Sequence, residues 1–424
     1  MNILIVGAGG REHALAFKIS QSPRLSKLFI APGNGGTAML GTNVPLKDND
    51  IDGIAAFARD NEIGLVVAGP ELPLVLGLKE RLDAVGIPCF GPCAFDAQLE
   101  GSKAFAKNMM RETGVPTADF RVFDSHEAAL AYVRTHPLPM VIKADGLAAG
   151  KGVVIAQTFV EAEEALHDMM IKQVFGPAGL TVVVEEALIG EEASFMTFCD
   201  GKTVVPMPSL QDHKRIGDND TGLNTGGMGA YSPAPILPED KYQAMADLAI
   251  RPITEHLAAI GQPFKGVLYA GFMMTANGPM VLEYNVRFGD PECQPLMARL
   301  KSDLVEIMVA CIEGSLSPEQ VVFHQETSCC VVMAAQGYPQ SYPKGMPIFG
   351  LEEAEKVESV KVFQAGTQLQ NGVPVSSGGR VLGVTALGSD LRQARERAYL
   401  AVEKIRFEHS YYRKDIANKG LRSS

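Results

Sequence analysis

Short apolar runs that end in glycine or proline recur through about the first hundred residues. The run 3–6 leads directly into the glycine-rich turn 7–10, and a helical pattern follows over 11–20. Similar runs at 28–30 and 65–68 also end in turns. Buried parallel strands have such continuous apolar sequences and alternate with helices in βαβ units. The pattern predicts a doubly wound parallel sheet, in which ligands gather at the carboxyl ends of the strands.

Beyond residue 100 the pattern mixes helical and strand periods. A helix is predicted to begin after Ser102, an N-cap residue, with Lys103 and Lys107 on one face. Helical patterns follow at 159–170, 242–260 and 295–313, and two strands at 266–274 and 280–288 are joined through Asn277-Gly278. From about residue 329, valine-rich strands and turns precede a basic helix at 391–405. This last part indicates a small α+β domain.

Residues 206–240 differ from the rest of the chain, because they are polar and rich in Gly, Pro, Asp and Asn. The segment is too long for a simple connection, so it is either disordered or an active-site loop. Residues 211–215 supply cations and carboxylates, and 224–231 supply a glycine run. Such a loop could close over phosphates, although a solvated surface loop is the plainer interpretation.

Length, charge and cysteine usage narrow the class of protein. At 424 residues the chain is long enough for roughly two to four domains. Its net charge of −11 opposes binding to nucleic acids and anionic membranes. The seven cysteines form no C-x-x-C pair, and no basic start precedes the first apolar run. We therefore expect a cytoplasmic protein with reduced thiols and no membrane segment.

The stretch 141–153 joins an apolar strand to a glycine-rich loop that carries Lys143 and Lys151. Glycines let backbone N–H groups approach phosphate oxygens, and lysines neutralise a polyphosphate. The loop is not a Walker A motif, because it is one residue short between its glycines and Gly152 replaces the Ser or Thr of that motif. The pattern predicts an ATP site whose metal ion is held elsewhere.

A second polar set lies on the segment 281–288, which alternates with a period of two. One face would carry Glu283, Asn285 and Arg287, and the other would carry the apolar side chains, beginning with Leu282. Carboxylate and amide oxygens suit Mg2+, and an arginine can contact a transferring phosphoryl group. Such alternation by itself is typical of a half-exposed strand. Together with a phosphate loop, it indicates a metal site.

Two weaker patterns accompany these motifs. An apolar strand leads into Glu185, Glu186 and Glu191, where backbone groups could contact adenine and a carboxylate could accept ribose hydroxyls. Solvated glutamates at a strand exit are the plainer interpretation. The turn 7–12 only half resembles the dinucleotide fingerprint, because a glutamate replaces the third glycine. A strand-to-helix turn can nevertheless hold one phosphate at the helix N-terminus.

Together these motifs resemble the glycinamide ribonucleotide synthetases, a family of the ATP-grasp superfamily, over essentially the whole chain. The blocks that carry the resemblance are Gly9-Gly10-Arg11-Glu12-His13-Ala14, Ala31-Pro32-Gly33-Asn34, Gly69-Pro70-Glu71, Gly101-Ser102-Lys103, Lys143 to Gly152, Gln211-Asp212-His213-Lys214-Arg215, Asn224 to Tyr231 and Arg287-Phe288-Gly289-Asp290-Pro291-Glu292. Leu223 and Val286 stand where the family usually has proline and cysteine. Neither side chain is expected to take part in the chemistry.

The resemblance implies an α/β and α+β protein of three domains. These are a doubly wound parallel-sheet domain over 1–100, a central ATP-grasp domain over 101–328 with a mobile lid lobe at about 120–190, and a small α+β domain over 329–424. It also implies ATP-dependent ligation of glycine to 5-phospho-β-D-ribosylamine through glycyl phosphate, with Mg2+ or Mn2+, in the second step of purine synthesis. We expect small-molecule substrates, no nucleic acid and a monomer. Transient contact with the preceding pathway enzyme is left open.

Site residues carried over from the family fall into four groups. ATP would be bound by Lys103, Lys143, Gly150, Lys151, Gly152, Glu185, Glu186, Leu188 and Glu191, and the metal ion by Glu283 and Asn285. The amine substrate or glycine would contact Gly9, Gly10, Arg11 and Asp290, and the reacting groups would contact Arg287, Asp212 and Lys214.

Three other functions are compatible with the residues. A nicotinamide oxidoreductase would use the N-terminal turn, although the third glycine is missing. A nucleotide-sensing module would bind ATP without turnover, and another ATP-grasp ligase would use a different acid or amine. Spacing alone does not identify the acid or the amine, so that choice depends on the family resemblance.

Overall fold

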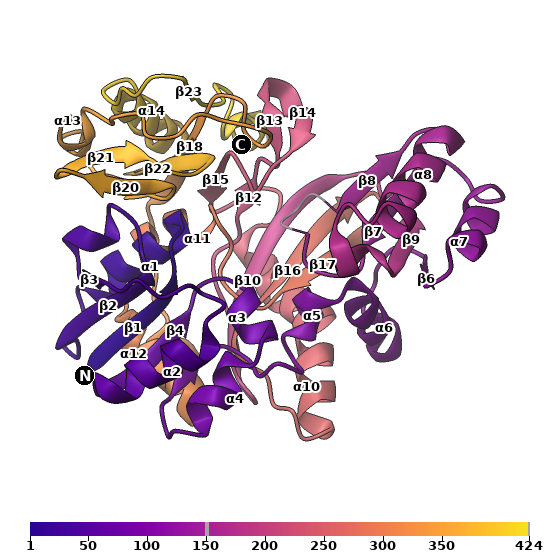
Figure 1. Cartoon of the computed structure of the whole chain (residues 1–424), viewed down its shortest axis with the longest axis horizontal. Helices are drawn as coiled ribbons and strands as arrows, with labels where there is room; N and C mark the ends of the chain where they lie inside the picture. The colour runs from indigo at the N-terminus through magenta and orange to yellow at the C-terminus, as the bar shows by residue number, and fades with distance from the viewer. Residues whose placement is uncertain (149–151, 423–424) are drawn as a thin grey trace.

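The computed structural model describes residues 1–148 and 152–422. Within these ranges the chain forms four sheets of four or more strands, with helices packed around them (Figure 1). In the same part of the chain, no helix has both the length and the apolar character needed to cross a membrane.

The N-terminal sheet is parallel and has the order β3-β2-β1-β4-β5. Its strands are β1 (Asn2–Gly7), β2 (Lys27–Pro32), β3 (Thr42–Asn43), β4 (Ile63–Ala68) and β5 (Cys89–Phe90). Leu4 and Val6 belong to the same core as α2 (Ile51–Asp60) and α4 (Leu78–Asp83), whereas Ile3 and Ile5 belong to the core of α1 (Gly10–Ile19) and α12 (Leu304–Glu313). Helices thus cover both faces, and the expected doubly wound sheet is confirmed.

A single helix expected over 295–313 is in fact two helices. The first, α11 (Cys293–Arg299), ends at Leu300, whose ψ of 119° is not helical. Asp303 then caps α12 by accepting a hydrogen bond from the backbone N–H of Val305 at 2.8 Å. The expectation was wrong because the apolar residues continue through the break, while the capping aspartate starts a new helix.

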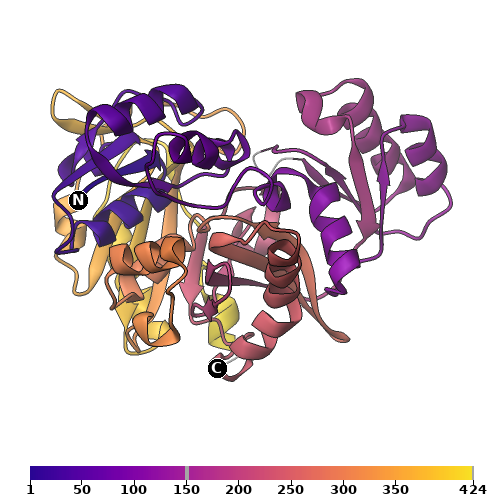
Figure 2. The same cartoon turned by 90° about the horizontal axis from the view of Figure 1, so that it is seen from below.

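The middle part of the chain forms two antiparallel sheets. The larger sheet contains β11 (Val204–Pro206), β10 (Glu191–Asp200), β16 (Lys265–Thr275) and β17 (Gly278–Asn285) in that order. The smaller sheet contains β6 (Phe120–Phe123), β9 (Val182–Glu186), β7 (Met140–Ala144) and β8 (Val153–Ala156), with α7 (His126–Val133) and α8 (Phe159–Leu166) packed against it. Figure 2 shows this small lobe, residues 120–186, to one side of the other sheets.

Strand β17 contains a bulge that the sequence pattern did not indicate. The register between β16 and β17 shifts by one residue at Leu282, and Val281 is buried in its place. The strand ends at Asn285, so Arg287 lies beyond it. The alternation predicted over 281–288 therefore holds only from residue 283 onward, because the bulge moves one residue to the other face.

The C-terminal sheet draws on two separate parts of the chain. Its later strands are β18 (Thr327–Ala335), β19 (Val360–Gln364), β22 (Arg380–Gly388) and β23 (Ser410–Tyr411), with α14 (Leu391–Val402) against them. Strands β12 (Gln211–Asp212) and β15 (Gly229–Ser232) come from the polar segment and extend the same sheet. Between them β13 (Arg215–Gly217) and β14 (Thr221–Asn224) form a hairpin. The polar segment is therefore ordered.

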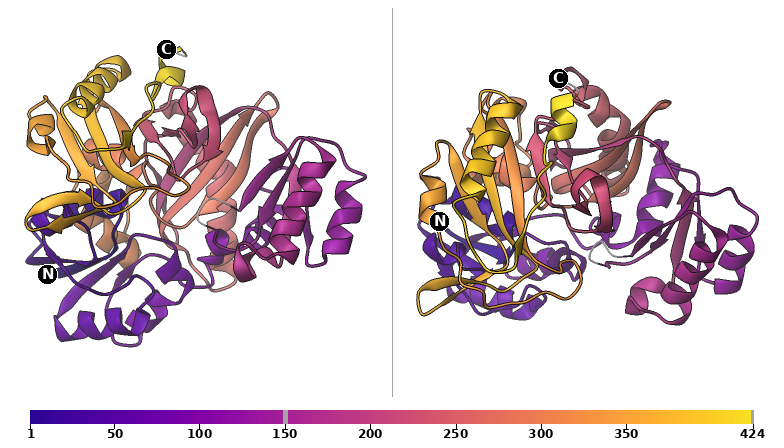
Figure 3. Two further views of the ribbon diagram at one scale, coloured as in Figure 1. Left: turned by 45° about the horizontal axis from the view of Figure 1, so that its top comes forward. Right: turned by 90° about the horizontal axis from the view of Figure 1, so that it is seen from above.

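The N-terminal and C-terminal sheets lie next to each other (Figure 3). The ring of His13 in α1 meets the ring of Phe363 in β19 edge-on, with centroids 5.7 Å apart. Asn34, after β2, donates to the carbonyl oxygen of Gln364 at 2.9 Å. These contacts place the carboxyl edge of the parallel sheet beside the last part of the chain.

Candidate active site

Lys103 and Lys143, the two lysines predicted to bind phosphate, lie on two elements that Asp145 holds together by hydrogen bonds. Lys103 begins α6 (Lys103–Thr113), and Lys143 lies on β7. Ser102 caps α6 as expected, accepting from Phe105 N at 3.0 Å. Asp145, two residues after Lys143, accepts from Ala104 N at 2.7 Å and from Ser102 Oγ at 2.9 Å. The start of α6 is thereby fixed against the end of β7.

Glu185 on β9 lies between two lysines and is only 4% exposed. Its carboxylate pairs with Lys107 at 2.5 Å and with Lys143. Burial lowers the pKa of Lys107 to about 8, although Glu185 opposes the shift. Burial would raise the pKa of Glu185, but the two lysines hold it below its usual range. The Glu185 side chain is therefore engaged by Lys107 and Lys143.

The predicted metal ligands lie beside these lysines. Lys143 Nζ donates to the carbonyl oxygen of Leu282, the bulge residue, at 3.3 Å, so β7 and β17 are adjacent at this point. Glu283 follows, and its carboxylate is 3.7 Å from Lys214 Nζ. Burial would raise the pKa of Glu283, yet Lys214, Lys143 and Lys103 together lower it to about 2. Glu283 is thus a carboxylate at neutral pH in a cationic environment.

Arg287 connects β17 with the edge of the N-terminal sheet. It donates to Asn285 Oδ1 at 3.0 Å, to Glu71 at 3.2 Å and to Glu100. Burial would lower the pKa of Arg287, but Glu100 and Glu71 raise it. Sequence reasoning did not assign either glutamate to the site. Glu71 follows β4 in a turn noted as a ligand edge, whereas Glu100 lies in the short helix α5 (Gln98–Gly101) and carried no signal.

Asp212 and Lys214 lie two residues apart in the polar segment. Lys214 Nζ is 2.8 Å from Glu192, which was not among the predicted residues. Burial and the nearby charge of Glu292 raise the pKa of Asp212. Gly227 has a φ of +111°, and a Cβ atom there would lie 2.6 Å from Asp212 Oδ1, so glycine allows the loop to approach this carboxyl.

Glu292 forms a buried cluster beside Asp212. Its Oε1 accepts from Tyr269 OH at 2.7 Å and from Ser194 Oγ at 3.1 Å. These three side chains come from α11's N-terminus, β16 and β10. None was assigned a role from the sequence, although Glu292 closes one of the blocks that carry the resemblance. Tyr269 and Ser194 had no signal, because they lie inside long apolar strands.

Asp290 lies against the N-terminal glycine turn. A Cβ atom on Gly9 would be 3.0 Å from Asp290 Oδ2, and one on Gly10 would be 3.6 Å from Oδ1. Arg380, from β22, donates to the Asp290 carbonyl oxygen at 2.6 Å, and its other terminal nitrogen is 3.5 Å from the carboxylate. Arg11 donates to the Phe288 carbonyl oxygen at 3.0 Å. Three separate parts of the chain therefore meet here, and Arg380 could not have been placed by local pattern.

The remaining predicted ATP residues lie near the connection between β9 and β10. Glu186 is exposed and Leu188 is partly exposed in this connection. Glu191 begins β10 and accepts from Gln211 Nε2 at 3.3 Å. The carbonyl oxygen of Gly152 accepts from Ala144 N at 2.8 Å.

Gly150 and Lys151 lie outside the described residues. The expectation that the lobe at about 120–190 is a mobile lid stays a prediction.

The donors at Glu283 and Asn285 suit a hard divalent cation. Both present oxygen atoms, and Mg2+ commonly takes one or two protein oxygens together with phosphate oxygens and water. Three lysines lower the pKa of Glu283, so its carboxylate is in the ionised form that a cation binds. In the described part of the chain, no group of three or more His, Cys, Asp or Glu residues could hold a metal ion.

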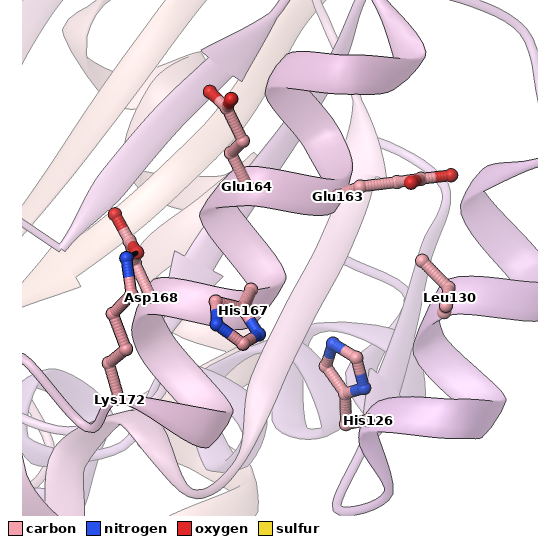
Figure 4. A pocket seen from close by; sticks show the side chains of 7 residues that line it. All are labelled: His126, Leu130, Glu163, Glu164, His167, Asp168 and Lys172. Carbon is pink, nitrogen blue, oxygen red and sulfur yellow. Dashed lines mark hydrogen bonds and ion pairs between the residues drawn. The ribbon is translucent and has the colours of Figure 1, made fainter.

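Two cavities lie outside these clusters. One, of about 520 Å³, lies between α7 and α8 on the small lobe and is lined by His126, Leu130, Glu163, Glu164, His167, Asp168 and Lys172 (Figure 4). It includes none of the predicted site residues. The other, of about 250 Å³, is lined by Pro32, Gly33, Asn34, Gly35, Ala38, Asn43, Thr367, Gln368 and Leu369, near the carboxyl edge of the parallel sheet.

Comparisons with known proteins give one family over nearly the whole chain. Residues 1–100 match the phosphoribosylglycinamide synthetase N domain, 101–293 its ATP-grasp (A) domain and 328–419 its C domain. The chain is 51% identical over 425 residues to a phosphoribosylamine–glycine ligase of Yersinia pestis, covering 99% of both chains. It is 50% identical over 427 residues to that of Rhodopirellula baltica, covering 99% of this chain and 98% of the relative.

A solved structure has the same architecture. The crystal structure of phosphoribosylamine–glycine ligase from Thermotoga maritima superposes with a TM-score of 0.86 at 33% identity, covering 98% of this chain and 100% of that one. The agreement extends over the N-terminal parallel sheet, the central sheets and the C-terminal sheet.

Proposed function

The chain belongs to the phosphoribosylglycinamide synthetase family, and from this we propose that it joins glycine to 5-phospho-β-D-ribosylamine at the expense of ATP. The products are glycinamide ribonucleotide, ADP and phosphate, in purine biosynthesis. Family membership favours this ligase over the oxidoreductase, the nucleotide sensor and the other ATP-grasp ligases that the residues alone allowed.

One observation in the site carries the proposal. Glu283, next to the bulge of β17, faces lysines from three separate parts of the chain, namely Lys103, Lys143 and Lys214. A triphosphate held by Lys103 and Lys143 would meet two cations and a carboxylate able to share a metal ion, and Lys214 would remain for the reacting groups. Transfer of a phosphoryl group depends mainly on this kind of positioning and charge neutralisation.

The reaction has two steps that balance in atoms and charge. A carboxylate oxygen of glycine attacks the γ-phosphorus, the bond to the β–γ bridging oxygen breaks, and ADP leaves. The amine nitrogen of phosphoribosylamine then attacks the acyl carbon of glycyl phosphate, phosphate leaves with the electrons of the C–O bond, and the nitrogen loses a proton. Phosphorylation is needed because a carboxylate itself is a poor acyl donor.

We assign the first step to the residues around β17. Lys103 and Lys143 hold ATP phosphates, and Arg287 contacts the transferring group. Glu283 and Asn285 would hold Mg2+ or Mn2+, which would neutralise phosphate charge when bound.

We assign the second step to the residues around the glycine turn. Gly9, Gly10, Arg11 and Asp290 bind the amine substrate. Asp212 accepts the proton released by the amine, since burial and Glu292 raise its pKa and a carboxylate with a raised pKa is a stronger base. Lys214, whose ammonium group is 3.7 Å from Glu283, would neutralise the negative charge that develops in either step.

The remaining features of the proposal concern organisation. We propose domain boundaries near residues 100 and 328, with the small lobe closing over ATP. We further propose that the protein acts as a monomer on small molecules in the cytoplasm. Analytical ultracentrifugation tests the oligomeric state.

The decisive experiment measures phosphate release from ATP with each amino acid, with and without phosphoribosylamine. We expect release to require both glycine and phosphoribosylamine. Equal release with another amino acid, or turnover with a different amine, would identify another ligase. ATP binding without any turnover would identify a sensor.

A further inference from the structure

The last part of the chain lies against the segment that carries Lys214. We call residues 411–417 the C-terminal brace. Tyr411 OH donates to the Ile216 carbonyl oxygen at 2.9 Å, and Arg413 donates to the Arg215 carbonyl oxygen at 3.0 Å. Ala417 N donates to His213 Nε2 at 3.3 Å. The brace thus contacts residues on both sides of Lys214 in sequence.

The tip of the β13–β14 hairpin is held by the same brace. Lys414 N donates to Asp218 Oδ1 at 2.8 Å, and Asn219 N donates to Asp415 Oδ2 at 2.8 Å. Arg413 also donates to Asp220 Oδ1 at 2.9 Å. The hairpin is therefore tied to the brace along its length, from the first strand to the turn.

Arg413 is the centre of these contacts. Its side chain is 1% exposed, and Asp415 accepts from its Nε at 2.8 Å and from a terminal nitrogen at 2.7 Å. A guanidinium can serve a carbonyl oxygen and two carboxylates at once because its donors form a rigid fork. Lysine has one nitrogen and could not reproduce this pattern.

Helix α14 holds the brace from the other side. Arg395 donates to the carbonyl oxygens of Ile416 at 2.9 Å and Lys414 at 2.8 Å. Tyr399 OH donates to the Arg413 carbonyl oxygen at 2.7 Å. Ala417 has a φ of +69°, a left-handed conformation that a residue with a Cβ atom keeps only where its surroundings hold it. Helix α14 therefore fixes the backbone of the brace at residues 413, 414 and 416.

Lys214 points away from the brace. Its ammonium group is 2.8 Å from Glu192 and 3.7 Å from Glu283, whereas the imidazole of His213 receives the hydrogen bond from Ala417. Successive side chains of an extended segment point to opposite sides. The contacts of residues 213 and 215 with the brace consequently fix the backbone from which the Lys214 side chain extends towards Glu192 and Glu283.

We propose that Arg413 is a positioning residue, which holds the backbone around Lys214 so that this lysine reaches the site of the reaction at Glu283. The inference rests on the proposed function, since it assigns Arg413 an effect on turnover that acts through Lys214. A group displaced by about 1 Å can lose on the order of a hundredfold in rate. The role is distinct from a contact with substrate, because Arg413 contacts only the protein chain.

The test compares Arg413→Met, Arg413→Lys and Tyr411→Phe with the wild type. Turnover is divided by the number of ATP-binding sites, so that unfolded protein does not count. We expect Arg413→Met to lower kcat/KM for glycine about ten- to a hundredfold with the affinity for ATP unchanged. Arg413→Lys should recover little of this loss. Arg397→Met is the matched control, because Arg397 lies in the same part of the chain but pairs with Glu358 and the Leu387 carbonyl oxygen.

If the arginine variants do not fold, Tyr411→Phe provides the test, because it removes only a single hydrogen bond at a partly exposed residue. We expect it to lower kcat/KM for glycine severalfold. If both Tyr411→Phe and every folded Arg413 variant turn over as fast as the wild type per ATP site, the proposal is wrong.

A double variant tests whether the effect passes through Lys214. In a Lys214→Ala background, Arg413→Met, or Tyr411→Phe if the former does not fold, should cause little further loss. A full additional loss would overturn the proposal. The wild-type assay separates this outcome from failure of the proposed function, because a chain that does not ligate glycine at all would show no glycine-dependent turnover before any substitution.

Discussion

At the scale of single residues, the site depends on charged side chains that the fold brings together before any substrate binds. Glu283 keeps a pKa of about 2 because three lysines and Arg287 outweigh its burial. Glu185 is a carboxylate for the same kind of reason, between Lys107 and Lys143. Each glutamate therefore restrains cations that would otherwise repel one another, and the lysines stay near the place where phosphates are expected.

Replacing Glu283 tests this arrangement. We expect Glu283→Ala to lower ligation about 100- to 1000-fold, because the metal ion loses a ligand and the productive geometry of ATP is lost. The measurement is glycine-dependent ADP release. Glu163→Ala is the control, since Glu163 is a carboxylate of the small lobe that pairs with Arg134 on the surface. Near-normal ADP release by Glu283→Ala would contradict the assignment of the metal site.

The sequence located several of these residues but not their partners. Alternation placed Glu283 and Asn285 on one side of a strand, and a spacing of four placed Lys103 and Lys107 on one face of a helix. That Lys107 serves Glu185 could not be foreseen, because the two residues lie on different elements and meet only when β9 packs beside α6.

At the scale of elements, the polar segment 206–240 changes most between expectation and structure. Its composition was compatible with disorder, but β12 and β15 join the C-terminal sheet and β13 and β14 form a hairpin. The short strands have few apolar residues of their own. They are ordered by pairing with β18, at residues 327–335, and by the C-terminal brace, at residues 411–417.

The titration of His213 tests this packing, because its buried imidazole makes the stability of the fold depend on pH. Its Nδ1 is 3.0 Å from the Gly229 carbonyl oxygen, and burial and the charge of Arg413 lower its pKa to about 4. The unfolded chain, with a pKa of about 6.5, takes up a proton that the folded chain does not. The folded state therefore has its full stability above about pH 6.5 and loses it as the pH falls towards 4.

We expect this histidine to remove about 2 kcal/mol of unfolding free energy between pH 8 and pH 5. In His213→Asn that contribution is absent, so the difference between wild type and variant should shift by this amount in favour of the variant. Urea unfolding at the two pH values measures it. His409→Asn, at an exposed histidine, is the control. A difference that stays constant with pH would show that His213 titrates normally in the fold.

At the scale of the whole molecule, the candidate site lies where all four sheets approach one another. The part proposed to bind the amine combines the N-terminal glycine turn, Asp290 after β17 and Arg380 from β22. The part proposed to bind the nucleotide combines β7 of the small lobe with β17 of the larger central sheet. Neither side is complete within one continuous stretch of chain.

Replacing Asn34 tests the contact between the N-terminal and C-terminal sheets. It is 5% exposed, donates to the carbonyl oxygens of Ala8 and Gln364, both at 2.9 Å, and accepts from Gly36 N at 2.8 Å. Asn34→Ala leaves these buried groups without partners, so we expect a loss of about 2–4 kcal/mol in unfolding free energy. We also expect a higher KM for phosphoribosylamine with an unchanged KM for ATP.

Chemical denaturation and steady-state kinetics measure both effects of Asn34→Ala. Asn61→Ala is the control, because Asn61 lies at the opposite end of the parallel sheet and bonds to the Phe57 carbonyl oxygen. Equal KM values for phosphoribosylamine in Asn34→Ala and the wild type would exclude a role for this contact in binding the amine.

The amino-acid sequence by itself determined the kinds of element and the faces they bury. Continuous apolar runs specified parallel strands, a period of two specified the polar side of β17, and the glycine-rich stretch specified where phosphates could be approached. These features are local, since they follow from backbone geometry and from the burial of neighbouring apolar residues. For that reason the fold class could be predicted.

Only the tertiary structure decided which charges meet. The bulge at Leu282 turns a carbonyl oxygen to Lys143, Arg287 takes its partners from the N-terminal part of the chain, and Arg413 reaches a carbonyl oxygen 198 residues away. Charged groups form ion pairs only where the packing brings them together, and no local pattern records which ones those are. The chemistry of the site is therefore encoded in residue types but assembled by long-range packing.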